Sequence, residues 1–599
     1  MARSAVRWLF FCVLASGWLG SLDATPVLRV VTAALGPISI TPGTNGVTQV
    51  VEAYNAGDGT LSLSLSSSAA WITPTVGAAR ACASTSAAAT CIPLTFALNT
   101  ASLAASPAGY TGIITVSAPG AVDAPQTITV TVNGVGPSSV NVYSPPGGWV
   151  EIPYSPVGEN FTPTVATADG ANWLSLEVVG PSGGTFCDSP GFPHNNCTTT
   201  YLIYIRPQPS NTAGNSYTGS IVISNSSYPP DDGTIPVTMH VTTLPIAQPS
   251  PTAISQQLAA SASVGYASVT LENSGEGTIA ISGATASGRG ITATGSGNTA
   301  HVAFDPTGLS PGTYAGSVSI VSNAANSPTT IPVSFQVVPA GPPTIFYRGV
   351  VDDATFGDNG VGGVAPGDIV ALFGQQLSFA SPTVGPAPPL AMELGGASVF
   401  VNGEQAPLYY TSYGQINFQM PMDTLTGKAL VQVQTNGQVG NTVSVNVAAR
   451  APELLPLYGT GGYGAIVDAS QGDGYDVLPI PSTIAVPGFI SQPARPGDVL
   501  TIYAIGLGPT NPAVATGQPA PDGIEAPLAR LTVTPTVSFA TYAPEVGVNA
   551  TPSYAGLSPH FAGLYQINVA IPADCPTGTV YVSLTFPDSF SNVVEIQVQ

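Results

Sequence analysis

A phrase that joins an aromatic turn to an alternating apolar strand recurs three times in this chain of 599 residues. It reads GYTGIITVS at 109–117, SYTGSIVIS at 216–224 and TYAGSVSIV at 313–321. The tyrosines, Tyr110, Tyr217 and Tyr314, therefore stand about one small domain apart. Self-similarity at a regular interval is the sequence signature of tandem units. The first part of the chain is predicted to contain three copies of one domain.

Apolar and polar residues alternate in the segments between turns, as in LSLSLS (61–66), TITVTVN (127–133) and VSVNVA (443–448). A period of two is typical of strands with one buried face, and Gly, Pro, Asn and Asp bound these runs. Helical periodicity is not convincing anywhere. We therefore expect an all-β fold of tandem immunoglobulin-like β-sandwich domains.

A second pair of repeats follows the Pro-rich joint PAGPPT (339–344). VAPGDIVALFGQQLS (364–378) is echoed by ARPGDVLTIYAIGLG (494–508), and YGQINFQMP (413–421) by LYQINVAIP (564–572). The predicted divisions are a signal peptide at 1–24 and sandwiches at 25–136, 137–243, 244–340, 341–449 and 450–599, the last of which begins with an irregular linker.

Two family resemblances accompany these repeats. The Trp-Ile/Leu stretch of the first two units, and the Tyr-x-Gly turn and closing P-x-T-I-x-V-x-V strand, resemble BACON-like immunoglobulin-type domains of secreted bacterial proteins. The first two units match best, because the third lacks both the tryptophan and the cysteines. From Phe346 to Gln599, the phrases PGD, GQIN, GLGP and GLYQIN resemble an uncharacterised C-terminal domain family of secreted acidobacterial proteins, with IPT/TIG-like sandwiches. The first resemblance implies a β-sandwich with a suggestion of carbohydrate binding, and the second implies no known activity.

The beginning of the chain predicts export. Arg3 and Arg7 precede the apolar run WLFFCVLASGWLGSL, which is shorter than a comfortable membrane span, so we expect a secretory signal peptide cleaved near Ala24. No later stretch offers about 20 uncharged apolar residues. The mature protein is expected to be secreted or held at the cell surface, and not to be an integral membrane protein.

Charge limits the partners. The net charge is −21, only 7% of the residues are charged, and Lys428 is the only lysine. Such a chain cannot present a basic face that follows phosphates, which argues against nucleic acid as a partner. Polysaccharide or another cell-surface component remains as a candidate partner, and no cofactor is expected.

The cysteines form two matched local pairs, Cys82 with Cys91 and Cys187 with Cys197. Two such pairs predict two disulfides in an oxidising compartment. The alternative, a zinc site, needs four ligands, and His194 is the only histidine near either pair. The remaining Cys575 is expected to be a buried small hydrophobe.

Aromatic and amide side chains leave two interpretations open. Trp71 and Trp173 precede alternating apolar positions, so we expect core anchors, with sugar platforms as the alternative. The amide faces of the two repeated strands favour structural hydrogen bonds over sugar binding. These faces consist of Gln415, Asn417 and Gln419 in the first repeat and of Gln566, Asn568 and Ala570 in the second.

The linker LYGTGGYGAIVDASQGDGYD in the last unit supplies the candidate ligand-binding residues. Loops on rigid sandwiches are common binding sites, so Tyr458, Tyr463 and Tyr475 are hypothesised to be exposed and to contact a ligand. The alternative is that these tyrosines only cover the joint. The segment from Asp468 to Asp476 is acidic like a calcium loop but lacks the alternating ligand spacing, so calcium binding there stays open.

An enzyme is not expected. GLSPG (308–312) matches Gly-x-Ser-x-Gly formally, but Ser310 lacks the preceding strand and following helix of a nucleophile elbow. The four histidines are scattered over separate units, and we expect neither catalytic nor metal-binding residues. The sequence favours a secreted, non-enzymatic structural or adhesion protein, and the alternative is an extracellular carbohydrate-binding protein.

The cysteine pairing yields a first prediction. Mass spectrometry of unreduced protein from an oxidising compartment should show Cys82–Cys91 and Cys187–Cys197 links and Cys575 as a thiol, because each pair lies within one predicted unit. A disulfide from Cys575 to any of the other four would overturn the pairing.

Overall fold

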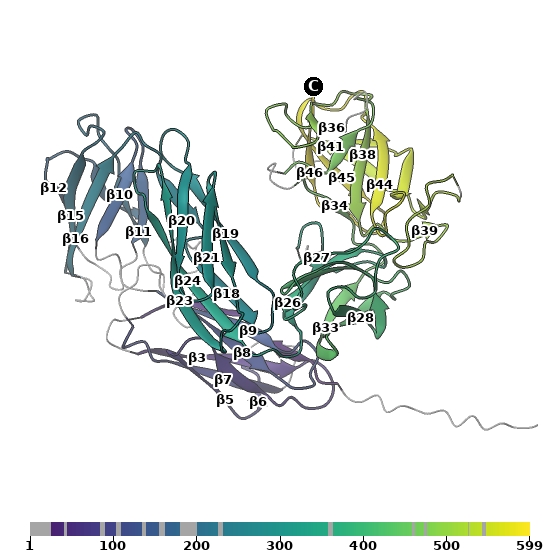
Figure 1. Ribbon diagram of the computed structural model, residues 1–599, viewed down its shortest axis with the longest axis horizontal. Coiled ribbons are helices and arrows are strands. Elements are labelled where there is room, and N and C mark those ends of the chain that lie inside the picture. The colour runs from purple at the N-terminus through teal and green to yellow at the C-terminus, as the bar shows by residue number, and fades with distance from the viewer. Residues whose placement is uncertain are drawn as a thin grey trace, which may run out of the picture.

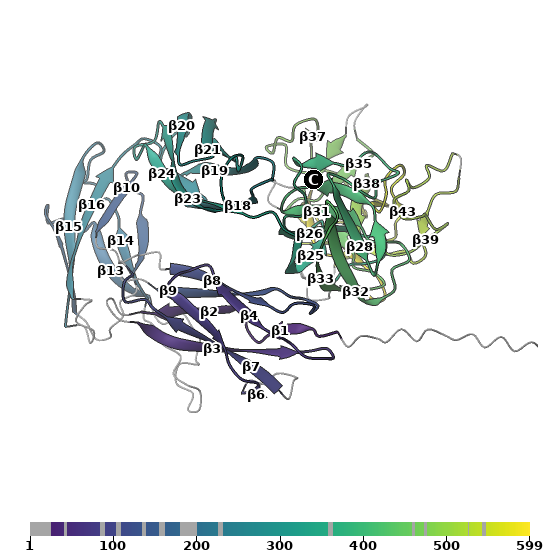
Figure 2. The ribbon, with the colours of Figure 1, turned by 60° about the horizontal axis from the view of Figure 1, so that its bottom comes forward.

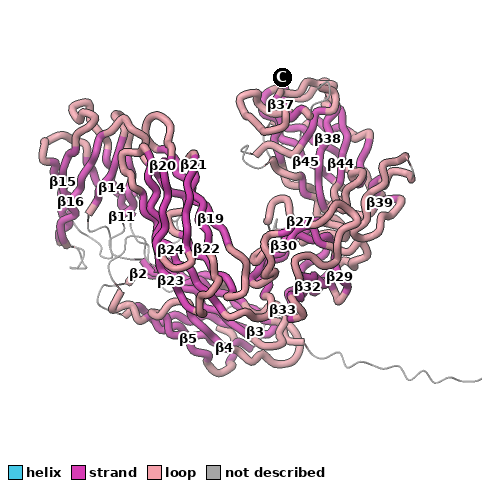
Figure 3. Tube along the Cα trace, in the orientation of Figure 1, coloured by secondary structure: helices cyan, strands magenta, loops and turns pink. Residues whose placement is uncertain are grey.

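The regular elements of the computed structural model are all strands, β1 to β46, arranged as five consecutive β-sandwiches (Figures 1 and 3). The structure describes residues 25–40, 45–83, 90–103, 110–133, 139–154, 162–179, 200–225, 232–357, 363–457, 462–471, 476–524, 526–541 and 547–599. Within these ranges, the predicted all-β, multidomain fold is confirmed. We number the sandwiches 1 (β1–β9), 2 (β10–β16), 3 (β17–β24), 4 (β25–β33) and 5 (β34–β46).

Sandwiches 1, 2 and 3 repeat one four-stranded sheet, in which the first two strands are parallel and the others antiparallel. In sandwich 1 its strands, in spatial order, are β2 (Ala34–Ser39), β9 (Gln126–Asn133), β8 (Tyr110–Ser117) and β4 (Ser64–Ser67). In sandwich 2 they are β10 (Val140–Ser144), β16 (Gly233–Val241), β15 (Ser216–Ser224) and β12 (Thr162–Thr167). In sandwich 3 they are β18 (Ile254–Ala259), β24 (Thr329–Val338), β23 (Gly312–Ser322) and β20 (Ile281–Ser287). The recurring phrase forms β8, β15 and β23, and so occupies the same inner position three times.

The tyrosine of the phrase fastens the turn that precedes its strand. In sandwich 2, the backbone N–H of Thr212 donates to the Tyr217 hydroxyl at 2.8 Å. In sandwich 3, the Tyr314 hydroxyl donates to the carbonyl of Ser310, also at 2.8 Å. A tyrosine hydroxyl that binds upstream backbone is a recurrent device of immunoglobulin-like sandwiches. The phrase therefore fixes how the chain enters the inner strand.

The second sheets complete the first three sandwiches. In sandwich 1 this sheet contains β1 (Leu28–Val30), β3 (Gly46–Asn55), β7 (Thr90–Leu98) and β5 (Ile72–Val76), with β6 (Arg80–Ala81) beside β7. In sandwich 2 it contains β11 (Val150–Tyr154), β14 (Thr200–Ile205) and β13 (Leu174–Val179). In sandwich 3 it contains β17 (Ala247–Ser250), β19 (Gly265–Asn273), β22 (Thr299–Phe304) and β21 (Ile291–Ser296). Each pair of sheets encloses its own apolar core.

The two tryptophans are core anchors, as the sequence favours. Trp71 is 9% exposed and Trp173 is 1% exposed. The glycine of the Tyr-x-Gly phrase lies against each ring: a Cβ on Gly112 would come within 3.4 Å of Trp71, and one on Gly219 within 3.2 Å of Trp173. In sandwiches 1 and 2, the tryptophan ring therefore packs against the glycine of the Tyr-x-Gly phrase.

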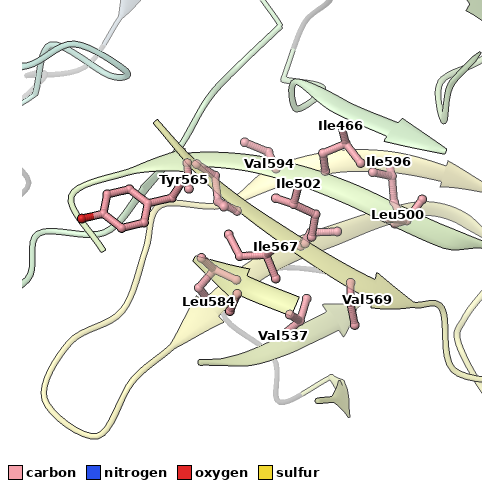
Figure 4. Packing of buried hydrophobic residues seen from close by; sticks show 14 of the residues in the cluster. Ile466, Leu500, Ile502, Val537, Tyr565, Ile567, Val569, Leu584, Val594 and Ile596 are labelled. Carbon is pink, nitrogen blue, oxygen red and sulfur yellow. The ribbon is translucent and has the colours of Figure 1, made fainter. Parts of the chain in front are cut away.

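Sandwiches 4 and 5 use a different pattern. One sheet of sandwich 4 contains β25 (Thr344–Asp352), β26 (Ile369–Gln375), β31 (Gln415–Gln419), β30 (Leu408–Thr411) and β27 (Thr383–Val384), and the other β29 (Glu404–Ala406), β28 (Ala397–Val401), β32 (Gly427–Thr435) and β33 (Gln438–Val447). In sandwich 5 the first sheet contains β37 (Ile490–Ser491), β36 (Val477–Leu478), β35 (Ile466–Asp468), β38 (Val499–Ile505), β44 (Tyr565–Ala570), β43 (Tyr554–Leu557), β40 (Arg530–Leu531) and β39 (Thr510–Asn511), with β34 (Glu453–Leu454) beside β38. The second sheet contains β42 (Val548–Ala550), β41 (Thr536–Ala540), β45 (Gly578–Thr585) and β46 (Val594–Val598). Figure 4 shows the core between the last two sheets.

The repeated phrases of these two sandwiches form equivalent strand pairs, β26 with β31 and β38 with β44. The amide side chains on one face of β31 and β44 form hydrogen bonds with each other. Gln415 Nε2 donates to Asn417 Oδ1 at 2.8 Å, and Gln566 Nε2 donates to Asn568 Oδ1 at 2.9 Å. The same bond in both repeats supports the structural interpretation of these side chains.

The chain folds back so that sandwich 1 contacts sandwich 4. Sandwich 1 lies beneath sandwich 3 in Figure 1, and its far end reaches sandwich 4; in Figure 2, β1 lies close to β32 and β33. Sandwich 3 also contacts sandwich 4, because Ser263 donates backbone and hydroxyl hydrogen bonds to the carbonyls of Phe379 and Ala380. The pockets described below all lie at such joints.

Burial of the tryptophans yields a second prediction. Trp173→Ala should lower the free energy of unfolding of sandwich 2 by about 3–5 kcal/mol, because a large core side chain is lost. Trp149→Ala is the matched control, since Trp149 lies in the same sandwich and is 56% exposed. Denaturant unfolding of both variants measures the difference, and equal stabilities would contradict the packing role.

Candidate binding sites at the joints between sandwiches

A pocket of about 540 Å³ lies between sandwiches 2 and 3. Trp149 lines it from sandwich 2 and is 56% exposed. Tyr143 and Glu151 join it from the same sandwich, and Gln248 and Asn326 from sandwich 3. An exposed aromatic ring beside amide and carboxylate groups is a surface suited to a sugar, whose apolar face can cover the ring while its hydroxyls are hydrogen-bonded.

Local sequence explains this arrangement. The turn PPGG ahead of β11 is closed by a 3.0 Å bond from Gly148 N to the Pro145 carbonyl, and Trp149 follows it immediately before the strand begins at Val150. Tyr143 is held by stacking on His240, whose ring centroid lies 4.6 Å away. Sequence reasoning missed Trp149, although a tryptophan placed directly after a Gly-Gly turn could have indicated exposure.

The contact between sandwiches 1 and 4 depends on Asp123, which is 1% exposed. Its carboxylate accepts hydrogen bonds from the backbone N–H of Ser444 at 2.6 Å and from the Ser444 hydroxyl at 2.9 Å. Arg29 of sandwich 1 forms an ion pair with the same carboxylate at 2.5 Å. Asp123 N also donates to the carbonyl of Thr442 at 3.0 Å. The buried carboxylate is thus paired within sandwich 1 and hydrogen-bonded across the joint to sandwich 4.

Asn441 adds a second link between the same sandwiches. Its Nδ2 donates to the Ala124 carbonyl of sandwich 1 and to the Ile345 carbonyl of sandwich 4, both at 3.0 Å. Its Oδ1 accepts from Ile345 N at 2.7 Å. The amide therefore ties β33, β25 and the Ala124 segment together.

Beyond Ile345, β25 bulges outward. Ile345 pairs with Gly374 and Val350 with Leu372, so four residues, 346–349, lie opposite Phe373 alone. Gly349 permits the bulge because a Cβ there would come within 2.5 Å of the Phe373 carbonyl. Arg348 has a left-handed backbone with φ of 57°, which is uncommon for a residue other than glycine. The bulge presents Tyr347 and Arg348 at the joint, and bulges often re-aim side chains in this way.

These residues line a pocket of about 260 Å³ between sandwiches 1 and 4. Arg29, Tyr347, Arg348, Lys428 and Asn446 are among its lining residues. The guanidinium carbons of Arg29 and Arg348 lie 5.6 Å and 5.7 Å from the centroid of the Tyr347 ring. Lys428 comes from β32 and is paired in register with Asn446 of β33. The pocket is therefore rich in cations and polar groups.

Sandwiches 4 and 5 meet through buried polar contacts. Gly517 N donates to Gln419 Oε1 at 2.7 Å, and the Tyr409 hydroxyl donates to the Ala562 carbonyl. Burial raises the pKa of Asp368 well above its usual range, and burial likewise raises the pKa of Asp353 to about 6. Asp353 accepts a 2.7 Å bond from Asn417 Nδ2, so these carboxyls belong to the interior of the sandwich and its joint.

The expected exposure of Tyr463 is wrong. Its side chain is 8% exposed and packs with Leu478 and Ile480. The cause is pairing of the linker with β46, because Gly464 N donates to the Glu595 carbonyl at 3.1 Å and Tyr463 lies on that paired segment. Tyr463 is a packing residue at the joint.

The other candidate residues of the linker, Tyr458 and Tyr475, lie outside the described residues. Asp468 is 1% exposed and accepts bonds from Ser470 N at 2.9 Å and from Gln471 Nε2 at 2.7 Å. Gln471 Nε2 also donates to Asp498 at 2.6 Å. Within the described ranges, no group of three or more His, Cys, Asp or Glu residues could hold a metal ion.

The Cys82–Cys91 disulfide is present, and it closes the segment between β6 and β7. Cys187 and Cys197 lie outside the described residues. Cys575 is a buried free thiol, and burial raises its pKa to about 11. Its thiolate is therefore scarce at neutral pH, which makes the group unreactive.

Ser310 lies in the turn before β23, where its carbonyl accepts the Tyr314 hydroxyl. This is the context of a structural turn and differs from the strand–turn–helix of a nucleophile elbow. In the part of the chain that the structure describes, no helix is long and apolar enough to cross a membrane.

No protein-family model matches this chain, and no curated protein sequence matches it. Among solved structures, the chain resembles Sidekick-1 immunoglobulin domains 1–5 (10% identity, 96% of this chain and 99% of that chain, TM-score 0.17) and the protocadherin GammaB4 extracellular domain (12% identity, 96% and 85%, TM-score 0.14). It also resembles the endo-fucoidan hydrolase MfFcnA4 from glycoside hydrolase family 107 (10% identity, TM-score 0.15), with 53% of this chain matching 45% of that one. The chain thus spans less than half of the hydrolase. At these TM-scores, the likenesses carry no argument about function.

The joint between sandwiches 1 and 4 yields a third prediction. Asp123→Ala leaves the backbone N–H of Ser444 without its acceptor and Arg29 without its ion partner, which costs about 1–3 kcal/mol per unsatisfied buried group. We expect hydrogen exchange at the Ser444 amide to accelerate at least about fivefold, in line with that energy. Asp588→Ala is the control, because Asp588 is half exposed in its pair with Arg450. Unchanged exchange at Ser444 would show that the carboxylate does not hold the joint.

Proposed function

We propose that this protein is a secreted, non-enzymatic structural and adhesion protein of the cell surface or extracellular space. The observation that carries the proposal is the joint at Asp123, whose buried carboxylate is paired with Arg29 inside sandwich 1 and accepts hydrogen bonds from the backbone and the hydroxyl of Ser444 in sandwich 4. A tandem array closed in this way holds its surfaces in fixed relative positions. Fixed surfaces favour a scaffold or attachment role over that of a flexible tether.

The finer family assignment belongs to the same proposal. Sandwiches 1 to 3 are BACON-like modules, supported by the shared inner strand and by the glycine contacts of Trp71 and Trp173. Sandwiches 4 and 5 are IPT/TIG-like modules of a secreted acidobacterial family, supported by the equivalent β26–β31 and β38–β44 pairs. The signal-like residues 1–24 and the Cys82–Cys91 disulfide support export to an oxidising space.

A second candidate function is carbohydrate binding, and the pocket between sandwiches 2 and 3 favours it. Trp149 offers an exposed indole, and Glu151, Gln248 and Asn326 offer hydrogen-bonding groups around it. Attachment to an extracellular polysaccharide would unite both functions, since the polysaccharide is then the surface to which the scaffold adheres.

A retention experiment tests the proposed function. Beads that carry residues 25–599 should retain the cells that export the protein, or polysaccharide purified from their surface, whereas beads without protein should not. Absence of retention of both, or release of new reducing ends from the polysaccharide, would overturn a non-enzymatic adhesion role.

Variants then separate the two candidates. Trp149→Ala should abolish retention of polysaccharide without lowering the melting temperature, if the pocket between sandwiches 2 and 3 binds sugar. Tyr266→Ala is the matched control, because Tyr266 is 69% exposed in sandwich 3 and does not line that pocket. Retention that is unaffected by Trp149→Ala leaves adhesion in place and removes this pocket from it.

A further inference from the structure

We infer that the pocket between sandwiches 2 and 3 takes an uncharged saccharide and excludes acidic ones. The inference rests on the carbohydrate-binding function proposed above for this pocket, and it adds the chemical class of the sugar. It follows from the charge of the lining and from the mixture of hydrogen-bond donors and acceptors that the lining offers.

The lining of the pocket carries negative charge and, among the described residues, no lysine or arginine. Glu151 is its one acidic residue. Arg206 and Arg289 are the only lysines or arginines between residues 137 and 338, and neither lines the pocket. The segments of these two sandwiches outside the described ranges therefore hold no lysine or arginine that could pair with Glu151. In a chain of net charge −21, an anionic ligand in this recess is repelled.

Glu151 stands beside the exposed indole. Trp149 directly precedes β11 and Glu151 is the second residue of that strand, so the two side chains lie on the same side of an extended chain, and both line the pocket. The two oxygens of an ionised carboxylate only accept hydrogen bonds, and here they can accept from neighbouring hydroxyls of one sugar. The indole can cover the apolar face of the same sugar ring.

The amide groups of the lining leave both donors and acceptors for a ligand. Asn141 Oδ1 accepts from His240 Nε2 at 2.7 Å, which leaves the N–H groups of Asn141 for the pocket. Gln248 Nε2 donates to Ser274 Oγ at 3.3 Å, which leaves the side-chain carbonyl of Gln248. A hydroxyl both donates and accepts, whereas a carboxylate or sulfate only accepts and an ammonium group only donates. The mixed lining therefore matches uncharged sugar hydroxyls.

Both walls of the pocket are tied to the linker that joins the two sandwiches. Thr242 N donates to the Ser144 carbonyl of sandwich 2 at 3.1 Å, and Ala325 N of sandwich 3 donates to the Pro245 carbonyl at 2.8 Å. The volume of about 540 Å³ lies within the range of about 300–1,000 Å³ that small-molecule sites span. A pocket whose walls are already held in place saves the ligand part of the cost of ordering them.

Titration calorimetry with residues 25–599 tests the inference. The uncharged probes are cellohexaose, laminarihexaose, maltohexaose and mannohexaose. Hexagalacturonic acid is the anionic probe and hexaglucosamine is the cationic one. We expect at least one uncharged probe to bind and hexagalacturonic acid to give no binding heat. The affinity for the uncharged probe should stay the same when the salt is raised to about 0.5 M, because it has no charge to screen.

Two variants locate the site. Trp149→Ala should abolish binding of the uncharged probe, and Glu151→Gln should weaken it about tenfold, because a charged hydrogen bond becomes a neutral one. Glu177→Gln is the matched control, since it removes the same charge from sandwich 2 without touching the pocket lining. Desolvation raises the pKa of Tyr204, and the charges of Glu151 and Glu177 raise it further, so both carboxylates lie near one tyrosine. The control should bind like the unaltered protein.

Each other outcome overturns a defined part of the inference. Hexagalacturonic acid that binds as tightly as the uncharged probes, and is lost in Trp149→Ala, would show that acidic sugars are not excluded. Hexaglucosamine that binds more tightly than every uncharged probe at the higher salt, with the same dependence on Trp149, would make the ligand an amino sugar. Equal loss in Glu151→Gln and Glu177→Gln would remove Glu151 from the site.

Failure of all six probes separates this inference from the proposed function. If polysaccharide is still retained on beads and Trp149→Ala still releases it, the assignment to an uncharged saccharide is wrong and carbohydrate binding stands. If the probes fail and Trp149→Ala leaves retention unchanged, the pocket binds no sugar, and only the adhesion function stands.

Discussion

A single buried carboxylate joins parts of this chain that are 321 residues apart in sequence, and the contact between sandwiches 1 and 4 is built around it. Asp123 is surrounded by Arg29 from its own sandwich and by the Ser444 backbone and hydroxyl from the fourth. A carboxylate taken out of water must be compensated by charge and hydrogen bonds together, or its burial is unfavourable. Arg29 is present in sandwich 1 itself, but the hydrogen bonds from Ser444 form only when sandwiches 1 and 4 are in contact. The desolvation cost of the carboxylate therefore favours this approach of the two sandwiches.

The fold could be predicted from the sequence because the interactions that form each sandwich lie within one repeat unit. Alternation along the strands sets which face is buried, and a repeated phrase such as that of Tyr217 fixes the same inner strand each time. The packing of Trp173 on Gly219 also lies within one unit, and so the tryptophan and the Tyr-x-Gly turn recur together. Sandwich 3 lacks the tryptophan, and there a Cβ on Gly316 would come within 2.2 Å of the Ser287 carbonyl. A Cβ on Gly219 would likewise come within 2.8 Å of the Ala166 carbonyl, so sandwiches 2 and 3 share this close approach of backbone and sandwich 2 adds the contact with the tryptophan.

The candidate binding sites could be predicted much less well, because the pockets lie at joints. The strand TIFYRGVVD does not alternate regularly between apolar and polar residues, and nothing in it shows that Gly349 approaches the Phe373 carbonyl closely and so permits a bulge. Arg29 is remote from Lys428 in sequence, and only the return of the chain brings both into one pocket. The error over Tyr463 has the same origin: a Gly-rich linker resembles an exposed loop until its pairing with Glu595 is known. Composition revealed that cations are few, but it could not reveal that they converge.

Because the pockets lie at joints, binding of a ligand there would depend on how two sandwiches are placed relative to each other. The cationic pocket takes Arg29 from sandwich 1 and Arg348 from sandwich 4, so a ligand that contacts both binds only the closed arrangement. Ligands that bind one state stabilise that state by mass action. A ligand that contacts both sandwiches would therefore act in the same direction as the hydrogen bonds from Ser444 to Asp123, since both hold the two sandwiches together.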